Sequence, residues 1–297
     1  MRPSLGTVAV LITCSTVVWG ASSAAGLAAR AFTSQRFSVV TRGQGPDVIL
    51  IPGLASHRDV WASAAALLED RYRLHLVQVN GFAGFAPGAN VEGPVSAPVA
   101  EEIARYIRET GIGRPAVIGH SMGGSMGMMM AARHPDVVGR LMIVDAVPFM
   151  GVMFGGTSAE GVRATADGIR TQILAEPLAS PTNPIAKMFP TMTRTEAMRP
   201  VLLQQATQSD PRTVATAFHE VLVTDLRPEL ARITAPITVL YAIPPGPMPP
   251  DQFDASVRLL YANAAGARLI KIDDSNHFIQ IDQPARFVAE VDAFMRR

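Results

Sequence analysis

The chain has 297 residues, a formal net charge of +1, and a hydrophobic fraction of 48%. This length allows one large domain or two, and the hydrophobic fraction is sufficient for a sizeable buried core. A near-neutral charge without a block of basic residues argues against nucleic acid as the main partner.

Residues 1–31 have the three-part pattern of a secretory signal. Arg2 precedes an apolar segment over 8–18, and small residues follow over 20–31. We therefore expect 1–31 to be a secretory signal peptide and the protein to be exported, to the periplasm or the extracellular space. An uncleaved N-terminal membrane anchor is the alternative. Because the apolar segment is shorter than the ~20 residues of a membrane helix, no stable span is expected.

Two positions suit cleavage of this signal, after Ala24 and after Ala31. Cys14, the only cysteine of the chain, precedes both. A cleaved protein would therefore contain no cysteine and could form no internal disulfide in any compartment.

After residue 31, short apolar runs alternate with segments of helical spacing. The predicted strands are 36–41, 48–51, 74–79, 116–118, 141–144, 237–241 and 268–272. A helix is expected where Val99, Ile103 and Ile107 recur on one face. Continuous apolar runs such as 48–51 suit strands that are covered on both faces. The alternation predicts an α/β fold, with a mostly parallel, doubly wound sheet between helical layers.

The alternation of strands and helices stops between residues 146 and 234. No strand is indicated there, and two amphipathic stretches, 162–173 and 214–222, predict helices. Because the α/β pattern returns afterwards, we expect 146–234 to be a helical cap or lid. It would be inserted between the two parts of the core, 32–145 and 235–297. A second, independent domain is the alternative.

Residues 119–123 (GHSMG) match the G-x-S-x-G pattern of a nucleophile elbow. A predicted strand before the pattern and a helix-compatible stretch over 125–133 after it provide the context that an elbow requires. The glycines leave room where a side chain would collide with neighbouring backbone. Ser121 is therefore the candidate nucleophile, next to a helix N-terminus whose N–H groups favour an oxyanion. An ordinary glycine-rich turn is the alternative.

A serine is a weak nucleophile unless a base removes its proton. His277 follows the last predicted strand, at the carboxyl end where the sites of such sheets are found. It also comes after Ser121 in the chain, the order expected for hydrolases of this architecture. His277 is therefore the candidate general base. The nearby acids Asp273, Asp274 and Asp282 are expected to have structural roles.

Three segments together resemble the α/β-hydrolase superfamily: 51–54 (IPGL), 119–124 (GHSMGG) and 275–284, which contains SNHF and DQP. The similarity covers most of the chain after the leader and is weakest in the predicted cap. It implies a serine esterase or lipase-like member with a helical cap. It also implies an oxyanion hole formed by the backbone N–H groups of Leu54 and Met122.

The acid of the expected triad departs from the usual pattern. The family commonly has an Asp a few residues after the strand predicted here at 237–241, but the next acid of this chain is Asp251. Asp145 directly follows another strand, at a position where some members of the superfamily carry their acid. Asp145 is our candidate for orienting the base, with Asp251 and then Asp254 as alternatives. A structural hydrogen bond is the other possible role of Asp145.

Several large apolar side chains flank loops that should face the site. The candidates for substrate binding are Phe82, Phe85, Phe149, Met150, Met153 and Phe154. An apolar lining that includes methionine suits a hydrophobic acyl or alcohol group. Contacts between the cap and the core are the alternative role for these side chains. No ligand spacing for a metal and no separate phosphate-binding loop occurs, so we expect no metal and no cofactor.

We therefore predict a serine hydrolase that cleaves small carboxylic esters of apolar character through Ser121, His277 and Asp145 and an acyl-enzyme. Another acyl hydrolase, such as a thioesterase, lactonase, carbon–carbon hydrolase or aminopeptidase, is an alternative. A non-catalytic protein that binds small ligands is a further alternative, favoured by the missing acid after 237–241. The sequence assigns no oligomeric state.

Overall fold

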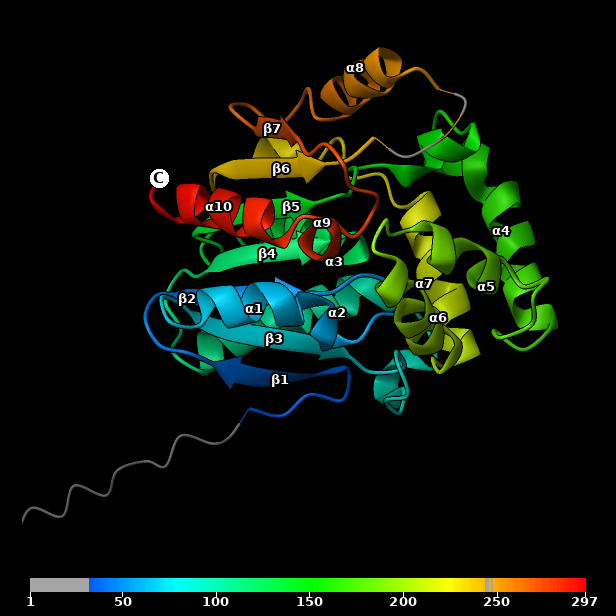
Figure 1. The fold of residues 1–297 in the computed structure, drawn as a ribbon, viewed down its shortest axis with the longest axis horizontal. Helices are drawn as coiled ribbons and strands as arrows, with labels where there is room; N and C mark the ends of the chain where they lie inside the picture. The colour runs from blue at the N-terminus through cyan, green and yellow to red at the C-terminus, as the bar shows by residue number, and fades with distance from the viewer. Residues whose placement is uncertain (1–31, 244–245, 247) are drawn as a thin grey trace, which may run out of the picture. The chain divides into compact units, whose positions relative to one another are not determined.

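A computed structural model describes residues 32–243, 246 and 248–297, and the predicted signal peptide lies outside them. The described residues form seven strands of one sheet: β1 (Phe37–Arg42), β2 (Asp47–Ile51), β3 (Arg73–Val79), β4 (Ala116–His120), β5 (Arg140–Val144), β6 (Ile237–Tyr241) and β7 (Arg268–Lys271). Their order across the sheet is β1-β3-β2-β4-β5-β6-β7 (Figure 1). β1 is antiparallel to β3, and the other neighbouring pairs are parallel. The predicted mostly parallel sheet is confirmed.

The strands form where the sequence has short apolar runs. All residues of β4 and of β6 are buried, as expected for strands with helices on both faces. The predicted bounds differ from the observed ones by about two residues at most, which is the usual uncertainty of element ends.

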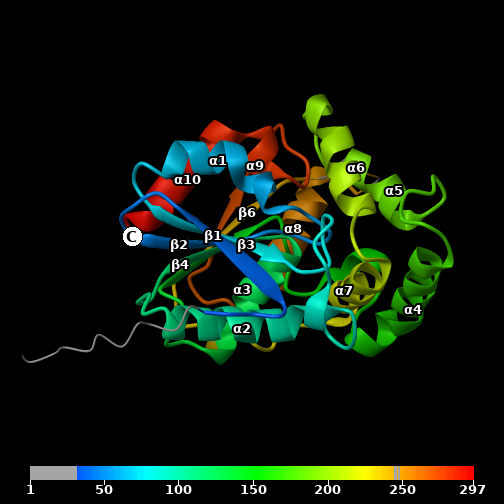
Figure 2. The ribbon, with the colours of Figure 1, turned by 90° about the horizontal axis from the view of Figure 1, so that it is seen from below.

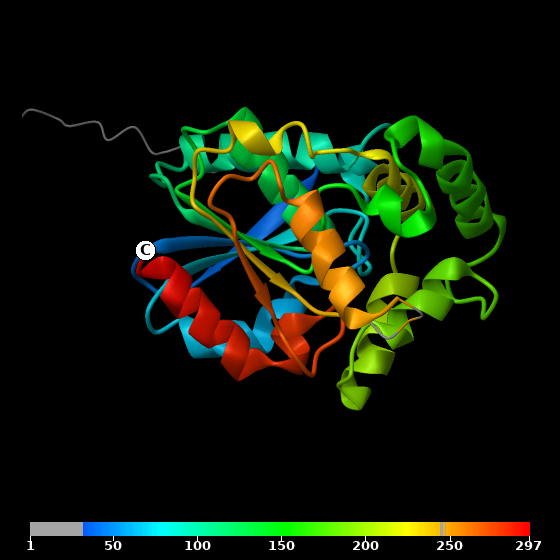
Figure 3. The same ribbon diagram turned by 90° about the horizontal axis from the view of Figure 1, so that it is seen from above.

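Six helices of the described residues belong to the core: α1 (Ala62–Leu68), α2 (Ser96–Glu109), α3 (Met122–Arg133), α8 (Pro250–Leu260), α9 (Ile279–Asp282) and α10 (Pro284–Met295). α1 and α10 pack together on one face of the sheet, and α2 and α3 pack together on the other (Figures 2 and 3). α3 lies along β4 and β5, so that its N-terminus is fixed at the edge where these strands end.

Between β5 and β6 the described chain is helical and contains no strand. Its α-helices are α4 (Ala159–Ala175), α5 (Pro184–Met188), α6 (Arg199–Thr207) and α7 (Pro211–Val223). These helices lie beyond the carboxyl ends of the parallel strands, at the right of Figure 1. Among the described helices, none has both the length and the apolar character that a membrane span needs.

The sequence predicted helices at the positions of α4 and α7 but not α5 or α6. Prolines interrupt the hydrophobic periodicity in this region, so the sequence pattern did not indicate the two short helices. In the structure Pro184 and Pro200 occupy the first turns of α5 and α6. A proline is tolerated there because the first N–H groups of a helix have no acceptor within the helix.

Candidate active site

Ser121 lies at the sharp turn between β4 and α3. Its backbone dihedrals are φ 54° and ψ −123°, a conformation that non-glycine residues rarely adopt. The turn is held by neighbouring strands and by the helix: the N–H of Ser121 donates to the carbonyl of Val144 at 2.9 Å, and its own carbonyl accepts from the N–H of Gly124 at 2.8 Å. This is the strand–turn–helix geometry expected of a nucleophile elbow.

The two glycines of the elbow are required by close backbone contacts. A Cβ atom on Gly119 would lie 2.1 Å from the carbonyl oxygen of Gly123. A Cβ atom on Gly123 would lie 2.3 Å from the carbonyl oxygen of Ile51. Both distances are far below van der Waals contact, so the turn can form only with glycine at these positions.

His277 lies in the loop after β7 and contacts Asp145. Its Nδ1 is 2.7 Å from Oδ2 of Asp145, and because a carboxylate only accepts, Nδ1 carries the proton. The other oxygen of Asp145 accepts from the N–H of Ala242 at 2.8 Å. Asp145 itself has a φ of 48°, and its N–H donates to Leu240 at 2.7 Å, so the carboxylate is anchored between the ends of β5 and β6.

Of the candidate acids, Asp145 alone contacts His277. Asp251 is an exposed residue in the first turn of α8, and among the described residues no hydrogen bond joins it to His277. Asp254 accepts instead from the hydroxyl of Tyr241 and from Arg258. Neither of these two acids of α8 therefore contacts the candidate base.

His120 supports His277 from behind the elbow, a role that the sequence analysis did not assign. Its Nε2–H donates to the backbone carbonyl of His277 at 2.9 Å, and the two rings lie 4.6 Å apart. Burial holds the pKa of His120 well below its ordinary value, and the neighbouring His277 lowers it further, so the ring is neutral. The feature of the sequence that could have indicated this role is the position of His120 directly before Ser121. From there its ring reaches the loop that contains His277.

Asp282 joins the predicted cap to the loop of His277. Its Oδ1 accepts from the hydroxyl of Thr193 at 2.5 Å, and its Oδ2 accepts from the N–H of Asn276 at 2.9 Å. The N–H groups of Arg194 and Thr195 also donate to the carboxylate, each at 3.0 Å from Oδ1. The structural role expected for Asp282 therefore consists of holding residues 193–195 against the residue that precedes the base.

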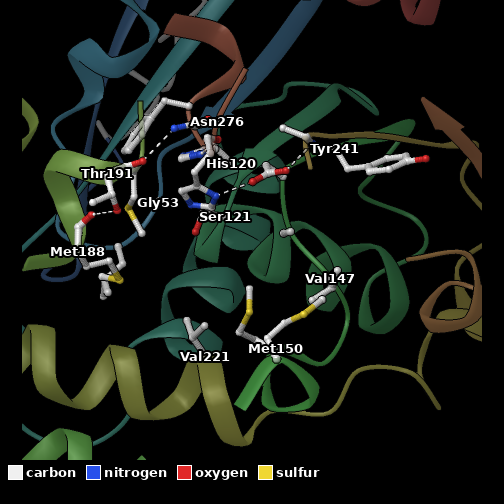
Figure 4. A pocket seen from close by; sticks show the side chains of 18 of the residues that line it. Gly53, His120, Ser121, Val147, Met150, Met188, Thr191, Val221, Tyr241 and Asn276 are labelled. Carbon is white, nitrogen blue, oxygen red and sulfur yellow. Dashed lines mark hydrogen bonds and ion pairs between the residues drawn. The ribbon is translucent and has the colours of Figure 1, made fainter. Parts of the chain in front are cut away.

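Ser121, His277 and Asp145 line one cavity of about 430 Å³, a size typical of small-molecule sites. Figure 4 shows Ser121 facing a space bordered by Met188, Met150 and Val221. Of the predicted apolar contacts, Met150, Met153 and Phe154 line the cavity. Among the described residues, no cluster of three or more His, Cys, Asp or Glu side chains is placed to hold a metal ion.

Phe82, Phe85 and Phe149 do not line the cavity, in contrast to their predicted role in substrate binding. Phe82 and Phe149 are fully buried in the core. Phe85 is 37% exposed, and its ring lies 5.6 Å from that of His57.

No described residue of the loop after β3 lines the cavity, and this loop is hydrogen-bonded to the turn between α6 and α7. The N–H of Asp210 donates to Gly81 at 2.7 Å, and the N–H of Gly84 donates to Gln208 at 3.1 Å. These contacts direct Phe82 into the core, which is the alternative role that the sequence left open for such side chains.

The backbone N–H groups of Leu54 and Met122 donate no hydrogen bond to a described residue. Leu54 lines the cavity, and Met122 is the first residue of α3, where N–H groups have no acceptor within the helix. The two N–H groups remain the predicted oxyanion donors, and of the two residues Leu54 lines the cavity while Met122 does not.

Comparison with known proteins gives relatives over most of the described chain. A model of the family described as "Alpha/beta hydrolase family" matches residues 48–291. A protein named pimeloyl-[acyl-carrier protein] methyl ester esterase from Vibrio vulnificus (strain YJ016) is 28% identical over 212 residues, which are 68% of this chain and 76% of that protein.

Solved structures share the fold at lower sequence identity. The enol-lactonase of Burkholderia xenovorans LB400 has a TM-score of 0.72 and 20% identity, covering 88% of this chain and 96% of its own. The esterase EaEST of Exiguobacterium antarcticum also has a TM-score of 0.72, with 18% identity, covering 89% of this chain and 98% of its own.

Proposed function

The chain belongs to the alpha/beta hydrolase family and is a hydrolase, and on this basis we propose that it is a serine hydrolase of apolar carboxylic esters. The observation that carries the proposal is the 2.7 Å hydrogen bond between His277 and Asp145 in the cavity that also contains Ser121. Relatives named as methyl ester esterases support ester cleavage, and the methionine-rich lining supports an apolar substrate.

In the proposed reaction, Oγ of Ser121 attacks the ester carbonyl while Nε2 of His277 takes its proton. Asp145 holds Nδ1–H of His277, which keeps Nε2 free to accept and stabilises the imidazolium that forms. His277 then gives the proton to the leaving alcohol, and an acyl-enzyme remains. Water, deprotonated by His277, releases the acid and restores Ser121.

The N–H groups of Leu54 and Met122 would donate to the oxyanion of the tetrahedral intermediate. They are fixed by backbone geometry before substrate arrives, so little reorganisation is needed when the charge develops. Removing one such donor in comparable sites lowers kcat by about 10²–10³.

The alternative of a non-catalytic binder was based on the missing acid after β6. Asp145, at the end of β5, contacts His277 with its carboxylate, so the missing acid after β6 no longer argues against catalysis. We therefore retain catalysis as the proposed function.

A fluorophosphonate probe tests for an activated serine. We expect labelling at Ser121 in the wild type, and loss of both labelling and p-nitrophenyl ester turnover in Ser121→Ala and His277→Ala. Ser125→Ala is the matched control, because residues 123–127 repeat the G-x-S-x-G spacing but Ser125 lies inside α3. Turnover that persists in Ser121→Ala, or labelling at Ser125, would show that the nucleophile is assigned wrongly.

We also propose that the protein is exported through a cleaved signal within residues 1–31. Mass spectrometry of the exported protein should find an N-terminus at about residue 25 or 32. An intact Met1 on exported protein would instead favour an uncleaved N-terminal anchor.

A further inference from the structure

Resting on the proposed ester hydrolysis, we propose that the cavity selects substrates that are uncharged and free of hydrogen-bonding groups along the whole acyl chain. An ester whose acyl chain ends in a carboxylate or a hydroxyl would then be rejected, even when the chain has the right length. The selection arises from the charges and hydrogen-bonding groups of the cavity wall that surround the far end of the acyl chain, and not from the chemistry at Ser121.

The described wall of the cavity offers no positively charged side chain to an anionic group. Among its described residues there is no Lys or Arg, and the acid at the site is Asp145, whose charge repels a carboxylate. His120 is neutral because burial lowers its pKa. A carboxylate bound deep in this wall would lose its hydration without gaining a positively charged partner, which is strongly unfavourable.

The polar side chains of the wall already donate to the protein itself. The hydroxyls of Ser56 and Thr191 donate to backbone carbonyl groups at 3.1 and 2.8 Å. The hydroxyl of Tyr241 donates to Asp254. One N–H of Asn276 donates to a backbone carbonyl at 3.0 Å, which leaves its second N–H as the one uncommitted side-chain donor of the described wall apart from the nucleophile. A terminal hydroxyl would therefore find few donors in the wall to replace the hydrogen bonds that it accepts from water.

The rest of the wall is apolar and adaptable. Met150 and Met153 come from the turn after β5, and Met188 and Met192 come from the opposite side, at and after the end of α5. Unbranched thioether side chains fill irregular space and follow the shape of a flexible alkyl chain. Each added methylene should raise kcat/KM about fourfold until the cavity is filled, because a buried CH₂ is favourable by about 0.8 kcal/mol.

The test compares p-nitrophenyl octanoate with the p-nitrophenyl half-ester of octanedioic acid and with p-nitrophenyl 8-hydroxyoctanoate. The three acyl chains have the same length and the same leaving group, so that only the terminal group differs. We expect the octanoate to be favoured at least about a hundredfold in kcat/KM over the half-ester and at least about tenfold over the hydroxy ester. A half-ester hydrolysed within about tenfold of the octanoate would overturn the inference.

A charge placed in the wall should reverse part of this preference. Met188→Lys keeps the length and flexibility of the side chain and adds a cation, so the preference against the half-ester should fall at least about tenfold. Met198→Lys is the matched control, because Met198 is a partly buried methionine outside the cavity wall. An equal change of preference in both variants would contradict the role of the wall.

A binding measurement separates failure of this inference from failure of the proposed function. Methyl octanoate and the monomethyl ester of octanedioic acid can be titrated calorimetrically into the Ser121→Ala protein, in which no turnover occurs. If the wild type cleaves none of the esters, ester hydrolysis is wrong, and tighter binding of methyl octanoate still supports the selectivity. Equal binding of the two esters overturns the selectivity whatever the wild type hydrolyses.

Discussion

Replacing Asp282 by Asn tests whether one carboxylate holds the helical region to the loop of the base. Oδ1 of Asp282 accepts from Thr193 and Thr195, and Oδ2 accepts from the N–H of Asn276, directly before His277. An Asn side chain has a single oxygen, so it can accept either from Thr193 and Thr195 or from the N–H of Asn276, but not from both sides. Its NH₂ would then face an N–H or a hydroxyl that has lost its acceptor.

The expected loss follows from these contacts. Hydrogen bonds to a charged group contribute about 1.5–3 kcal/mol net, and a buried donor left without an acceptor costs about 1–3 kcal/mol. Because Asp282 is only half-buried, we expect the free energy of unfolding to fall by about 2–3 kcal/mol. At about 2–4 °C per kcal/mol, the Tm should fall by about 4–12 °C. Displacement of His277 should lower kcat/KM at least about tenfold.

The destabilisation should depend on pH. Burial by itself raises the pKa of Asp282, but hydrogen bonds from Thr193, Asn276 and Arg194 lower it by more, so the folded-state pKa lies below the ordinary value. The stabilisation by this carboxylate is therefore present above the unfolded-state pKa of about 3.9 and is lost as the pH falls through the folded-state pKa. The difference between wild type and Asp282→Asn should be full at about pH 7 and should shrink below about pH 4.

Urea unfolding at about pH 7 and about pH 3.5, together with ester hydrolysis, measures both effects. Asp273→Asn is the matched control: it makes the same charge change in the same loop, but its side chain is 78% exposed and is paired with Lys271. It should change the free energy of unfolding by no more than about 0.5 kcal/mol and leave kcat/KM unchanged. The reasoning is refuted if Asp282→Asn is as stable as Asp273→Asn, or if its destabilisation does not shrink in acid.

Asp145→Asn should lower kcat by about 10⁴, because an Asn in its place favours the wrong tautomer of the base; Asp251→Asn should leave kcat unchanged, and the reverse result would reassign the acid. Gly119→Ala should prevent the native elbow from forming, because its Cβ would lie 2.1 Å from a backbone oxygen, and circular dichroism and probe labelling would detect the loss. Phe82→Leu should reduce the free energy of unfolding by about 1–2 kcal/mol without changing KM, since Phe82 is fully buried outside the cavity; a raised KM with unchanged stability would restore it as a substrate contact.

Local features of the sequence were sufficient for the sheet and the elbow. The strands form where apolar runs occur, because a strand covered on both faces requires nearly every side chain to be apolar. The elbow could be located because it is coded by five adjacent residues, 119–123, in which Gly119 and Gly123 have no room for a Cβ. The position of His277 followed from its place after the last strand, at the edge where the carboxyl ends of parallel strands meet.

Pairings between distant residues were decided by the tertiary structure. Asp145 and His277 are 132 positions apart, and their contact exists because β6 lies between β5 and β7 and brings the loops at their ends together. From the sequence, Asp251 and Asp254 remained open alternatives, since their loop could also have approached the base. The hydrogen bonds between Asp282 and residues 193–195 could not be predicted from the sequence either, because neither segment contains a motif that indicates contact with the other.

The sequence by itself determined the fold class, the elbow at Ser121 and the candidate base, since each depends on hydrophobic periodicity or on backbone sterics within a few residues. The contact between Asp145 and His277, the cavity wall and the burial of Phe82 and Phe149 were decided only by the tertiary structure. An aromatic residue in a loop gains free energy from burial in any apolar site that it can reach. Which site it reaches depends on how the helical region packs against the sheet, and that packing is a property of the whole chain.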